Sequence, residues 1–309
     1  MLTYELHLML KTKHFILILL TTFSFNNSAK ELAITFDDSP RFARGYFDGQ
    51  TRAKKLIETL RNHNVEQVAF FSVSKNLNDE GIERLKLYAN AGHIIANHTN
   101  SHPNFNQLEL IDYQKDFLEA DKHLKQFKTY KKLFRYPYLR EGNTVEKRDG
   151  MRTTLGELGY INAYITLNNY DWYIENLFQK AIKDNANLNF DKLSKFYTDV
   201  LVQSIEYYDD MANKHLGRSP KHILLLHEMD ITALFIGDLV DELRARGWKI
   251  ITPEQAYTDE IAQYKTDRVF KHNPGRIGEI ARDKGQTKGL WHESCDENYL
   301  DLRFIKEVL

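Results

Sequence analysis

The sequence predicts an α/β fold with a parallel β core, and three features support that class. After residue 30, short apolar runs rich in β-branched and aromatic residues alternate with longer amphipathic stretches. Several amphipathic stretches end at a glycine, as helices often do. Chemically capable polar residues follow the apolar runs, where the carboxyl ends of parallel strands build functional sites. An open doubly wound sheet and a closed barrel both satisfy this pattern.

The apolar and amphipathic runs define the expected elements. Strands are predicted over 32–36, 68–72, 93–97, 132–136, 161–165, 222–227 and 248–251, and helices over 51–63, 79–91, 108–127, 144–158, 190–216 and 231–246. We interpret the insertion at 173–216 as a helix that coats the sheet; the alternative is a segment that shapes a substrate groove. Residues 266–309 lose the periodicity and are expected to form a tail or small cap without an assigned role.

Composition narrows the class of protein. A chain of 309 residues has room for one large α/β domain or two small ones. Hydrophobic residues at 42% and charged residues at 28% are ordinary for a folded globular protein. The formal net charge of -1 gives no field that attracts nucleic acid. We therefore expect a monomer with no nucleic-acid partner and no membrane span in the mature chain.

The chain has a single cysteine, Cys295. One thiol cannot form an intrachain disulfide, and a thiolate zinc site is excluded as well. Cys295 lies in a polar C-terminal stretch, far along the chain from every motif described below, so we expect no catalytic role for it.

The N-terminus has the pattern of a secretory signal peptide. Lys11, Lys13 and His14 precede the apolar run 15–20, and small and polar residues follow up to Ala29. The run is shorter than the roughly 20 apolar residues needed to span a bilayer. We predict a signal peptide over 1–29, an exported protein in the periplasm or outside the cell, and a main domain over 30–265. The alternative is a buried first helix.

Two adjacent carboxylates, Asp37 and Asp38, follow the first predicted strand and precede Ser39 and Pro40. Neighbouring side chains of extended backbone point to opposite sides, so the two carboxylates can serve different partners. One can bind a metal while the other accepts a proton. The alternative is an ordinary turn, for which Asp before Ser-Pro is also suited.

His98 and His102 follow the third predicted strand with i, i+4 spacing. On one face of a helical turn, both imidazoles can reach a single ion. An aspartate from another strand end completes a set of three protein ligands and leaves positions open for water and substrate, as catalytic zinc requires.

Two further motifs lie at strand ends. Arg135 begins the sequence RYPY, which extends to Tyr138, and His227 closes the apolar run LLLH. A histidine directly after an apolar strand is either a capped core residue or a proton donor at the mouth of a site. The residues alone leave both readings open.

The ordered set TFDD (35–38), HTNSH (98–102), RYPY (135–138), DW (171–172) and LLLH (224–227) closely resembles the five motifs of the polysaccharide deacetylases, carbohydrate esterase family 4, also called the NodB-homology domain. The resemblance spans roughly residues 31–257. It implies a distorted barrel of seven or eight βα units. It also implies a metal-dependent hydrolase that removes acetyl groups from an N-acetylated or O-acetylated polysaccharide such as chitin oligomers, peptidoglycan or xylan.

The resemblance also assigns roles at the reacting centre. It makes Asp38, His98 and His102 the ligands of Zn²⁺ or of another divalent ion such as Co²⁺. It makes Asp37 the general base and His227 the general acid, which suits a carboxylate and an imidazole placed around an activated water.

Five surrounding residues receive roles from the same resemblance. Arg135 resembles the arginine that orients the catalytic aspartate, and the backbone N–H of Tyr138 resembles an oxyanion donor. Trp172 and Leu224 resemble the walls that hold the acetyl methyl group. Asp171, which precedes Trp172, is expected on the substrate side.

One position departs from the family pattern, which commonly reads D-x-x-D-W around the fourth motif. The first aspartate of that pattern supports the histidine acid, and here Asn168 occupies its position. An amide stabilises imidazolium less well than a carboxylate. In one alternative, the pKa of His227 is lower than in relatives, and Asn168→Asp shifts the alkaline limb of the pH-rate profile to higher pH. In the other, Asp171 supports His227 in place of the missing aspartate.

Two alternative functions remain at this stage. One is a sugar-binding relative that has lost catalysis, which is disfavoured because all five catalytic and ligand residues are present. The other is an amidase or esterase of the same fold that acts on a small acetylated molecule.

Overall fold

The computed structural model describes residues 30–309. The predicted signal peptide over 1–29 lies outside the described residues. No helix of the described part is long and apolar enough to cross a bilayer.

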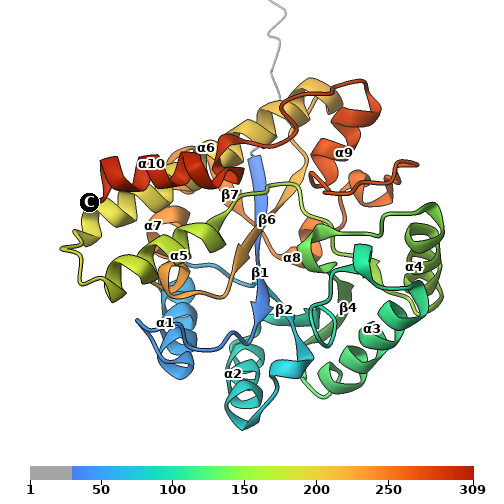
Figure 1. Ribbon diagram of the computed structural model, residues 1–309, viewed down its shortest axis with the longest axis horizontal. Helices are drawn as coiled ribbons and strands as arrows, with labels where there is room; N and C mark the ends of the chain where they lie inside the picture. The colour runs from blue at the N-terminus through green and yellow to red at the C-terminus, as the bar shows by residue number, and fades with distance from the viewer. Residues whose placement is uncertain (1–29) are drawn as a thin grey trace, which may run out of the picture.

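The described strands form one curled sheet in which every pairing is parallel (Figure 1). Its spatial order is β5 (Ile161–Asn162), β4 (Tyr130–Phe134), β3 (Ile94–Asn97), β2 (Ala69–Ser72), β1 (Lys30–Ser39) and β6 (Lys221–His227), and β7 (Trp248–Ile250) also pairs with β1. β6 lines one edge of β1, so β2 and β7 share the other edge at its two ends. The two strands that carry Asp37 and His227 are therefore neighbours.

The chain after β5 closes the sheet into the distorted barrel that the sequence predicts. Leu167 forms a parallel bridge with Leu224 of β6, and Leu225 N donates to Leu167 O at 3.2 Å. The strand predicted over 161–165 ends at Asn162 because the chain leaves β4 there and crosses to β6. The strand predicted over 132–136 begins and ends two residues earlier, so Arg135 follows β4 instead of ending it.

Helices surround the strands (Figure 1). They are α1 (Gly49–Asn62), α2 (Asp79–Asn90), α3 (Leu110–Leu124), α4 (Val145–Glu157), α5 (Asp171–Lys183), α6 (Phe190–Leu216), α7 (Asp230–Ala245), α8 (Pro253–Ala256), α9 (Arg276–Asp283) and α10 (Glu297–Glu307). The six predicted helices are present within a few residues of their expected ends. The insertion at 173–216 holds two helices, because the chain turns at 184–189 between α5 and α6.

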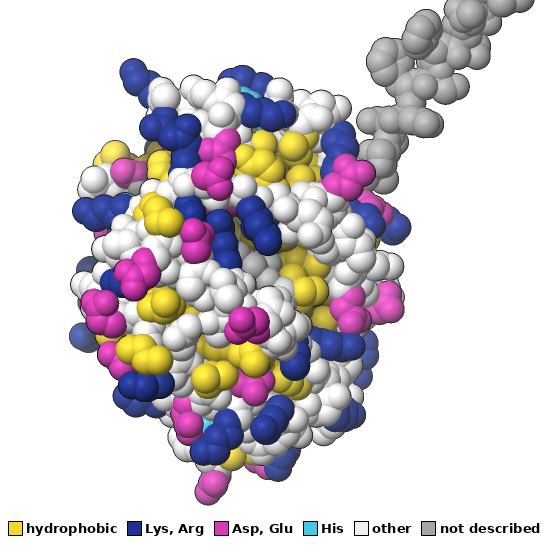
Figure 2. All heavy atoms as spheres, turned by 90° about the vertical axis from the view of Figure 1, so that its right-hand side faces the viewer, with side chains coloured by type: hydrophobic (Ala, Val, Ile, Leu, Met, Phe, Trp, Pro, Cys, Tyr) yellow, Lys and Arg dark blue, Asp and Glu magenta, His cyan; other side chains and the backbone are white. Residues whose placement is uncertain are grey.

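The long helix α6 coats the barrel, as expected for a helix with one apolar face. Its buried side chains recur at helical spacing, and Gly217 ends it in a left-handed conformation with φ 75°. A second, aromatic-rich core lies around α3, α4 and β4, where Phe105 stacks on Tyr113 at 3.9 Å between ring centroids. Figure 2 shows one face of the molecule, on which acidic and basic side chains are intermixed, in line with the low net charge.

Residues 266–309 pack on the barrel, although no long amphipathic element is predicted for them. α9 contacts α6, and α10 contacts α5 and α6 (Figure 1). Arg276 begins α9 and is buried, with Nε 2.9 Å from Glu279 Oε2 and Nη1 2.7 Å from Ile261 O and 2.6 Å from Tyr264 O. Arg276 therefore joins the C-terminal segment to the chain that follows β7.

We expect Arg276→Ala to destabilise the protein by about 3–5 kcal/mol, because it leaves the buried Glu279 carboxylate without its cation. The free energy of unfolding in urea measures the effect. Arg246→Ala is the matched control, since Arg246 pairs with Glu242 on an exposed helix surface and such pairs contribute about 0–1 kcal/mol. Equal losses in the two variants would contradict the anchoring role.

Candidate active site and metal centre

The carboxyl end of β1 presents Asp37 and Asp38 to different partners. Asp37 pairs in register with His227 of β6, and the ladder to β2 is irregular between Phe36 and Ser39. Asp38 lies in the left-handed region with φ 67°. This conformation is costly for a residue with a side chain and is typical of positions constrained by function. The two neighbouring carboxylates therefore lie in different backbone environments.

His98 and His102 lie in a loop after β3, which corrects the expected helical turn. Thr99 and His102 have φ values of 69° and 56°, so a helix cannot form there. Side chains hold the loop instead. Thr99 Oγ1 accepts from His102 N at 3.0 Å, Asn97 Oδ1 accepts from Thr99 N at 2.8 Å, and the Asp116 carboxylate accepts from the backbone of the loop.

Three potential ligand atoms from Asp38, His98 and His102 lie within 4.8 Å of one another. Asp38 Oδ1 is 3.0 Å from His102 Nε2 and 3.5 Å from His98 Nε2. This oxygen is buried and receives no hydrogen bond of acceptable geometry. His98 Nδ1 is 2.8 Å from Arg135 O, which holds its proton on Nδ1 and leaves the Nε2 lone pair for a ligand. The donor set fits a divalent metal ion.

The environment of Asp38 keeps it ionised, as a ligand must be. Burial alone raises the pKa of this carboxyl, but the His102 and His98 imidazoles outweigh it and hold the pKa well below its usual range. Arg41 Nη1 lies 2.8 Å from Asp38 Oδ2. Arg41 thus occupies one oxygen, and the other faces the histidines.

Asp37 is held by Arg135, which is buried. Arg135 Nη1 donates to Asp37 Oδ1 at 2.9 Å, and the guanidinium lies over the Phe71 ring at 4.2 Å from its centroid. Asp37 Oδ2 is the oxygen nearer the ligand cluster, 3.9 Å from His98 Nε2. Arg135 therefore fixes the orientation of the Asp37 carboxylate and leaves Oδ2 on the side of the ligand cluster.

His227 is held by Asp171, which answers the question that Asn168 raises. Asp171 Oδ1 is 2.7 Å from His227 Nδ1, and Asp171 Oδ2 accepts from His227 N at 2.7 Å. Burial lowers the pKa of His227, but the Asp171 carboxylate more than compensates, so its pKa is raised. Of the two alternatives for His227, these contacts favour support by Asp171. Asn168 Oδ1 accepts from the neighbouring Asn169 N instead.

The expected substrate role of Asp171 is wrong. Its side chain has no exposed surface, and both carboxylate oxygens are engaged by His227. The reason lies in α5. Asp171 is the first residue of that helix, which packs beside β6 and directs the carboxylate inwards.

A cavity of about 610 Å³ contains the ligand cluster, Asp37 and His227. Its volume is within the range of small-molecule sites, about 300–1,000 Å³. Trp172 and Tyr138 line it, as expected. Leu224 does not, because it is fully buried and bridges Leu167; Leu225 lines the cavity in its place. Alternation along a strand predicts this, since residues i and i−2 share a face and His227 faces the cavity.

Tyr138 has φ 57° and lines the cavity. The hydrogen bonds of the short turn at 137–139 start at Leu139 N, so the Tyr138 N–H has no partner within the turn. Its ring, which is 57% exposed, contacts His102 edge to face at 4.6 Å. Tyr138 can thus offer a ligand both a backbone hydrogen-bond donor and the flat surface of its ring.

Sequence reasoning missed several residues of the cavity. Arg41 and Asn176 line it, as do His272, Asn273 and Trp291 of the C-terminal segment. A local signal existed only for Arg41, three residues after Asp38. The others reach the cavity through tertiary packing that no motif encodes.

Comparison with known proteins places this site in context. Residues 25–159 match the family model for polysaccharide deacetylases. A peptidoglycan-N-acetylglucosamine deacetylase from Bacillus cereus is 32% identical over 117 residues, which is 38% of this chain and 39% of that relative. The alignment thus spans well under half the length of that curated relative.

Solved structures show the same fold. A mutant of the peptidoglycan deacetylase PdaC from Bacillus subtilis has a TM-score of 0.51 and 18% identity, with 74% of this chain and 90% of that chain covered. A CE4 family pseudoenzyme from Bacillus anthracis has a TM-score of 0.51 and 16% identity, with 74% of this chain and 66% of that chain covered. The fold is therefore shared by a peptidoglycan deacetylase and a pseudoenzyme, and activity must be argued from the residues of the site.

Proposed function

We propose that the chain is a zinc-dependent hydrolase of the polysaccharide deacetylase family that removes acetyl groups from an N-acetylated polysaccharide. Residues 25–159 match the model of that family, and a peptidoglycan deacetylase is 32% identical over 117 residues. One observation carries the proposal. A three-ligand cluster, a carboxylate and a carboxylate-supported imidazole all lie in one cavity, although they come from β1, β6 and the loop after β3. This is the set of groups that metal-assisted hydrolysis requires.

Asp38, His98 and His102 would hold the metal. When bound, the ion would supply Lewis-acid polarisation of the acetyl carbonyl and make water a stronger acid. Thiolate ligands are absent from the cluster, and the three protein ligands leave positions open, which suits a catalytic ion better than a structural one.

The remaining groups move protons and stabilise charge. Asp37 Oδ2 accepts a proton from the attacking water, since Arg135 occupies Oδ1. His227 donates a proton to the departing amine from Nε2, because Nδ1 is held by Asp171. The backbone N–H of Tyr138 is suited to meet the negative charge on the carbonyl oxygen.

An inactive carbohydrate-binding relative is the competing function, since a structural neighbour is a pseudoenzyme. The intact geometry disfavours it. Asp37 is still paired with Arg135 at 2.9 Å, and His227 with Asp171 at 2.7 Å. An amidase or esterase for a small acetylated molecule uses the same chemistry and differs only in what fills the cavity.

Acetate release from a panel of acetylated compounds identifies the substrate. We expect acetate release from N-acetylglucosamine oligomers or peptidoglycan, and slower release from acetylxylan and acetylated polyamines. The matched control is His98→Ala, which should lose bound zinc and activity together. Release from acetylated polyamines alone would contradict the polysaccharide assignment, and release from none would favour the binding relative.

We also propose that the mature protein acts in the periplasm or outside the cell. The signal peptide predicted over residues 1–29 supports this location, where wall and environmental polymers are found. Fractionation of cells that express the full chain tests it, and retention of uncleaved protein in the cytoplasm would contradict it.

A further inference from the structure

Residues far from every family motif form part of the catalytic cavity. His272, Asn273 and Trp291 line the same cavity as Asp37 and His227. All three come from the C-terminal segment, which lies beyond the residues 25–159 that match the family model. The segment is therefore placed where it meets whatever occupies the site.

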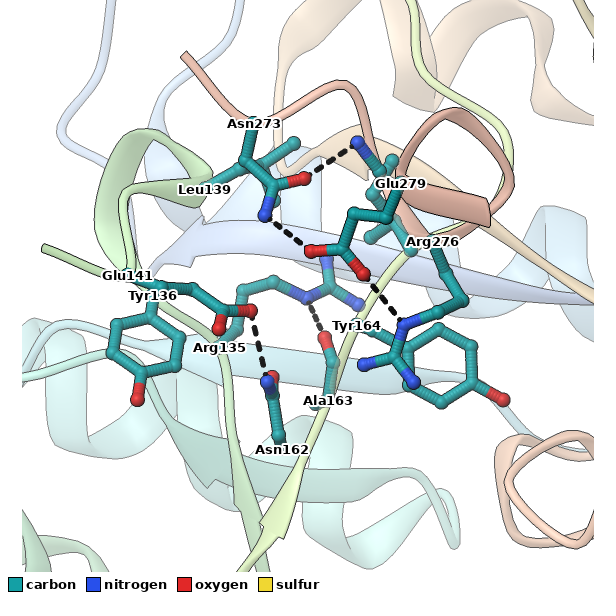
Figure 3. Close-up of a pocket in the computed structure, with 12 residues that line it drawn as sticks. Arg135, Tyr136, Leu139, Glu141, Asn162, Ala163, Tyr164, Asn273, Arg276 and Glu279 are labelled. Atoms are coloured by element: carbon teal, nitrogen blue, oxygen red, sulfur yellow. Dashed lines mark hydrogen bonds and ion pairs between the residues drawn. The ribbon is translucent and has the colours of Figure 1, made fainter. Parts of the chain in front are cut away.

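The segment is fixed in this place by buried polar contacts (Figure 3). Asn273 Nδ2 donates to Glu279 Oε1 at 2.7 Å, and Asn273 Oδ1 accepts from Gly275 N at 2.7 Å. Arg276 completes the network through Glu279. Glu279 is 3% exposed, so the network is shielded from water. The part of the C-terminal segment that lines the cavity forms a wall of the site, and this network holds that wall in place before a ligand binds.

The network lies beside Arg135, which orients Asp37, and beside the segment that closes the barrel. Arg276 N donates to Ile165 O at 2.8 Å, and Arg135 Nε donates to Ala163 O, two residues earlier. Gly275 has φ 81°, and a Cβ there would lie 2.8 Å from Ile165 Cδ1. Glycine is thus required for the close approach of the C-terminal segment to the barrel.

Trp291 is the residue of this wall with the chemistry to bind a sugar. Its neighbours are anchored: Leu290 is buried, and the His292 ring packs against Tyr207 at 5.2 Å. Gly289 O accepts from Tyr207 Oη at 2.6 Å. Trp291 itself remains 41% exposed while lining the cavity. A large apolar ring held half open at a polar cavity loses little conformational freedom on binding.

The polar partners at this wall suit a hydroxylated ligand. His272 and Asn273 of the same segment line the cavity together with Trp291. Asn176 lines it from α5, and Arg44 lines it from the loop after β1. A pyranose presents an apolar face of C–H groups and a rim of hydroxyl groups. The apolar face gains free energy by covering an indole, and the hydroxyls need hydrogen-bonding partners.

We propose that the C-terminal segment forms a second sugar subsite, with Trp291 as its stacking platform, so that the site prefers an oligosaccharide over a single acetylated sugar. The proposal rests on the proposed function for the identity of the ligand as an acetylated glycan. It adds a specificity-determining residue that the family motifs do not contain.

Binding and turnover of N-acetylglucosamine tetramer and monomer test the proposal. In an Asp37→Asn background, which prevents turnover, calorimetry with the zinc-loaded protein should show that Trp291→Ala weakens tetramer binding about tenfold. Monomer binding should change much less. Trp291→Phe retains a flat ring and should recover most of the tetramer affinity. With Asp37 intact, Trp291→Ala should raise the KM for the tetramer much more than it lowers kcat.

Leu302→Ala is the matched control, since Leu302 is a 71% exposed apolar residue of the same segment and does not line the cavity. Equal effects of Leu302→Ala and Trp291→Ala would overturn the subsite. So would a protein that shows no preference for tetramer over monomer. Tetramer binding that depends on Trp291 without any acetate release would sustain the subsite and refute the deacetylase function, so the two failures are distinguishable.

Discussion

Asp37→Asn is expected to lower kcat for acetate release by about 10²–10⁴-fold, the usual contribution of a positioned general base. The change keeps the shape of the side chain but removes the oxygen that accepts the proton. Asp37 Oδ1 is committed to Arg135 at 2.9 Å, and only Oδ2 faces the ligand cluster. An amide cannot act as a base at that position, and no other carboxylate in the cavity is free of a ligand role.

The metal content of this variant provides its control. Asp37 lies outside the ligand set, so Asp37→Asn should still bind one equivalent of zinc, whereas Asp38→Asn should bind it poorly. Substrate affinity should change little, since the effect is on the chemical step. An Asp37→Asn protein that retains zinc and works within tenfold of the wild-type rate would contradict the assignment of the base.

Asp171→Asn is expected to lower kcat by about 10²–10⁴-fold through a different mechanism. Asp171 Oδ1 fixes the proton of His227 on Nδ1 and supports the imidazolium. Without the carboxylate, the pKa of His227 falls. A general acid must be protonated, so activity is lost as the pH rises through its pKa. The alkaline limb of the pH-rate profile should therefore move to lower pH in the residual activity.

Asn168→Asp is the informative counterpart of this variant. The family pattern alone predicts that Asn168→Asp shifts the alkaline limb of the pH-rate profile to higher pH. The geometry predicts a small effect, because Asn168 contacts Asn169 and Asp171 already occupies His227 Nδ1. A shift of the alkaline limb in Asn168→Asp, with none in Asp171→Asn, would contradict the account of His227.

The strand ends and the chemistry that they carry could be predicted from the sequence. The apolar runs locate β1, β3 and β6 within three residues, and the polar residues directly after these runs are the ones that meet in the cavity. This succeeds because parallel strands bring their carboxyl ends to one edge whatever the loops do. Alternation along β6 also contained the answer for Leu225, which the assignment of Leu224 overlooked.

The support of His227 and the loop of the metal site could not be predicted in the same way. Asp171 reaches His227 only because α5 begins beside β6, and sequence spacing does not encode where a helix starts in space. Left-handed backbone at Asp38, Thr99 and His102 is also invisible in sequence, since none is glycine. Tertiary contacts impose these conformations.

The C-terminal segment shows a third kind of failure. Residues 266–309 form only short helices, in which the buried apolar face spans one or two turns, as with Ile277 and Ile280 of α9. Polar networks such as Asn273 with Glu279 and single aromatic contacts supply the other contacts of the segment. Periodicity detects long elements with one buried face. A wall assembled from short elements leaves no such signature, although it lines the active cavity.

The decisive measurement is acetate release from an N-acetylglucosamine oligomer by metal-stripped protein, before and after addition of one equivalent of Zn²⁺. We expect almost no release from the stripped protein and full recovery with zinc. We also expect no recovery in His98→Ala, which lacks one of the three ligand atoms that lie within 4.8 Å of one another. Undiminished release from fully stripped protein would contradict a catalytic metal held by Asp38, His98 and His102.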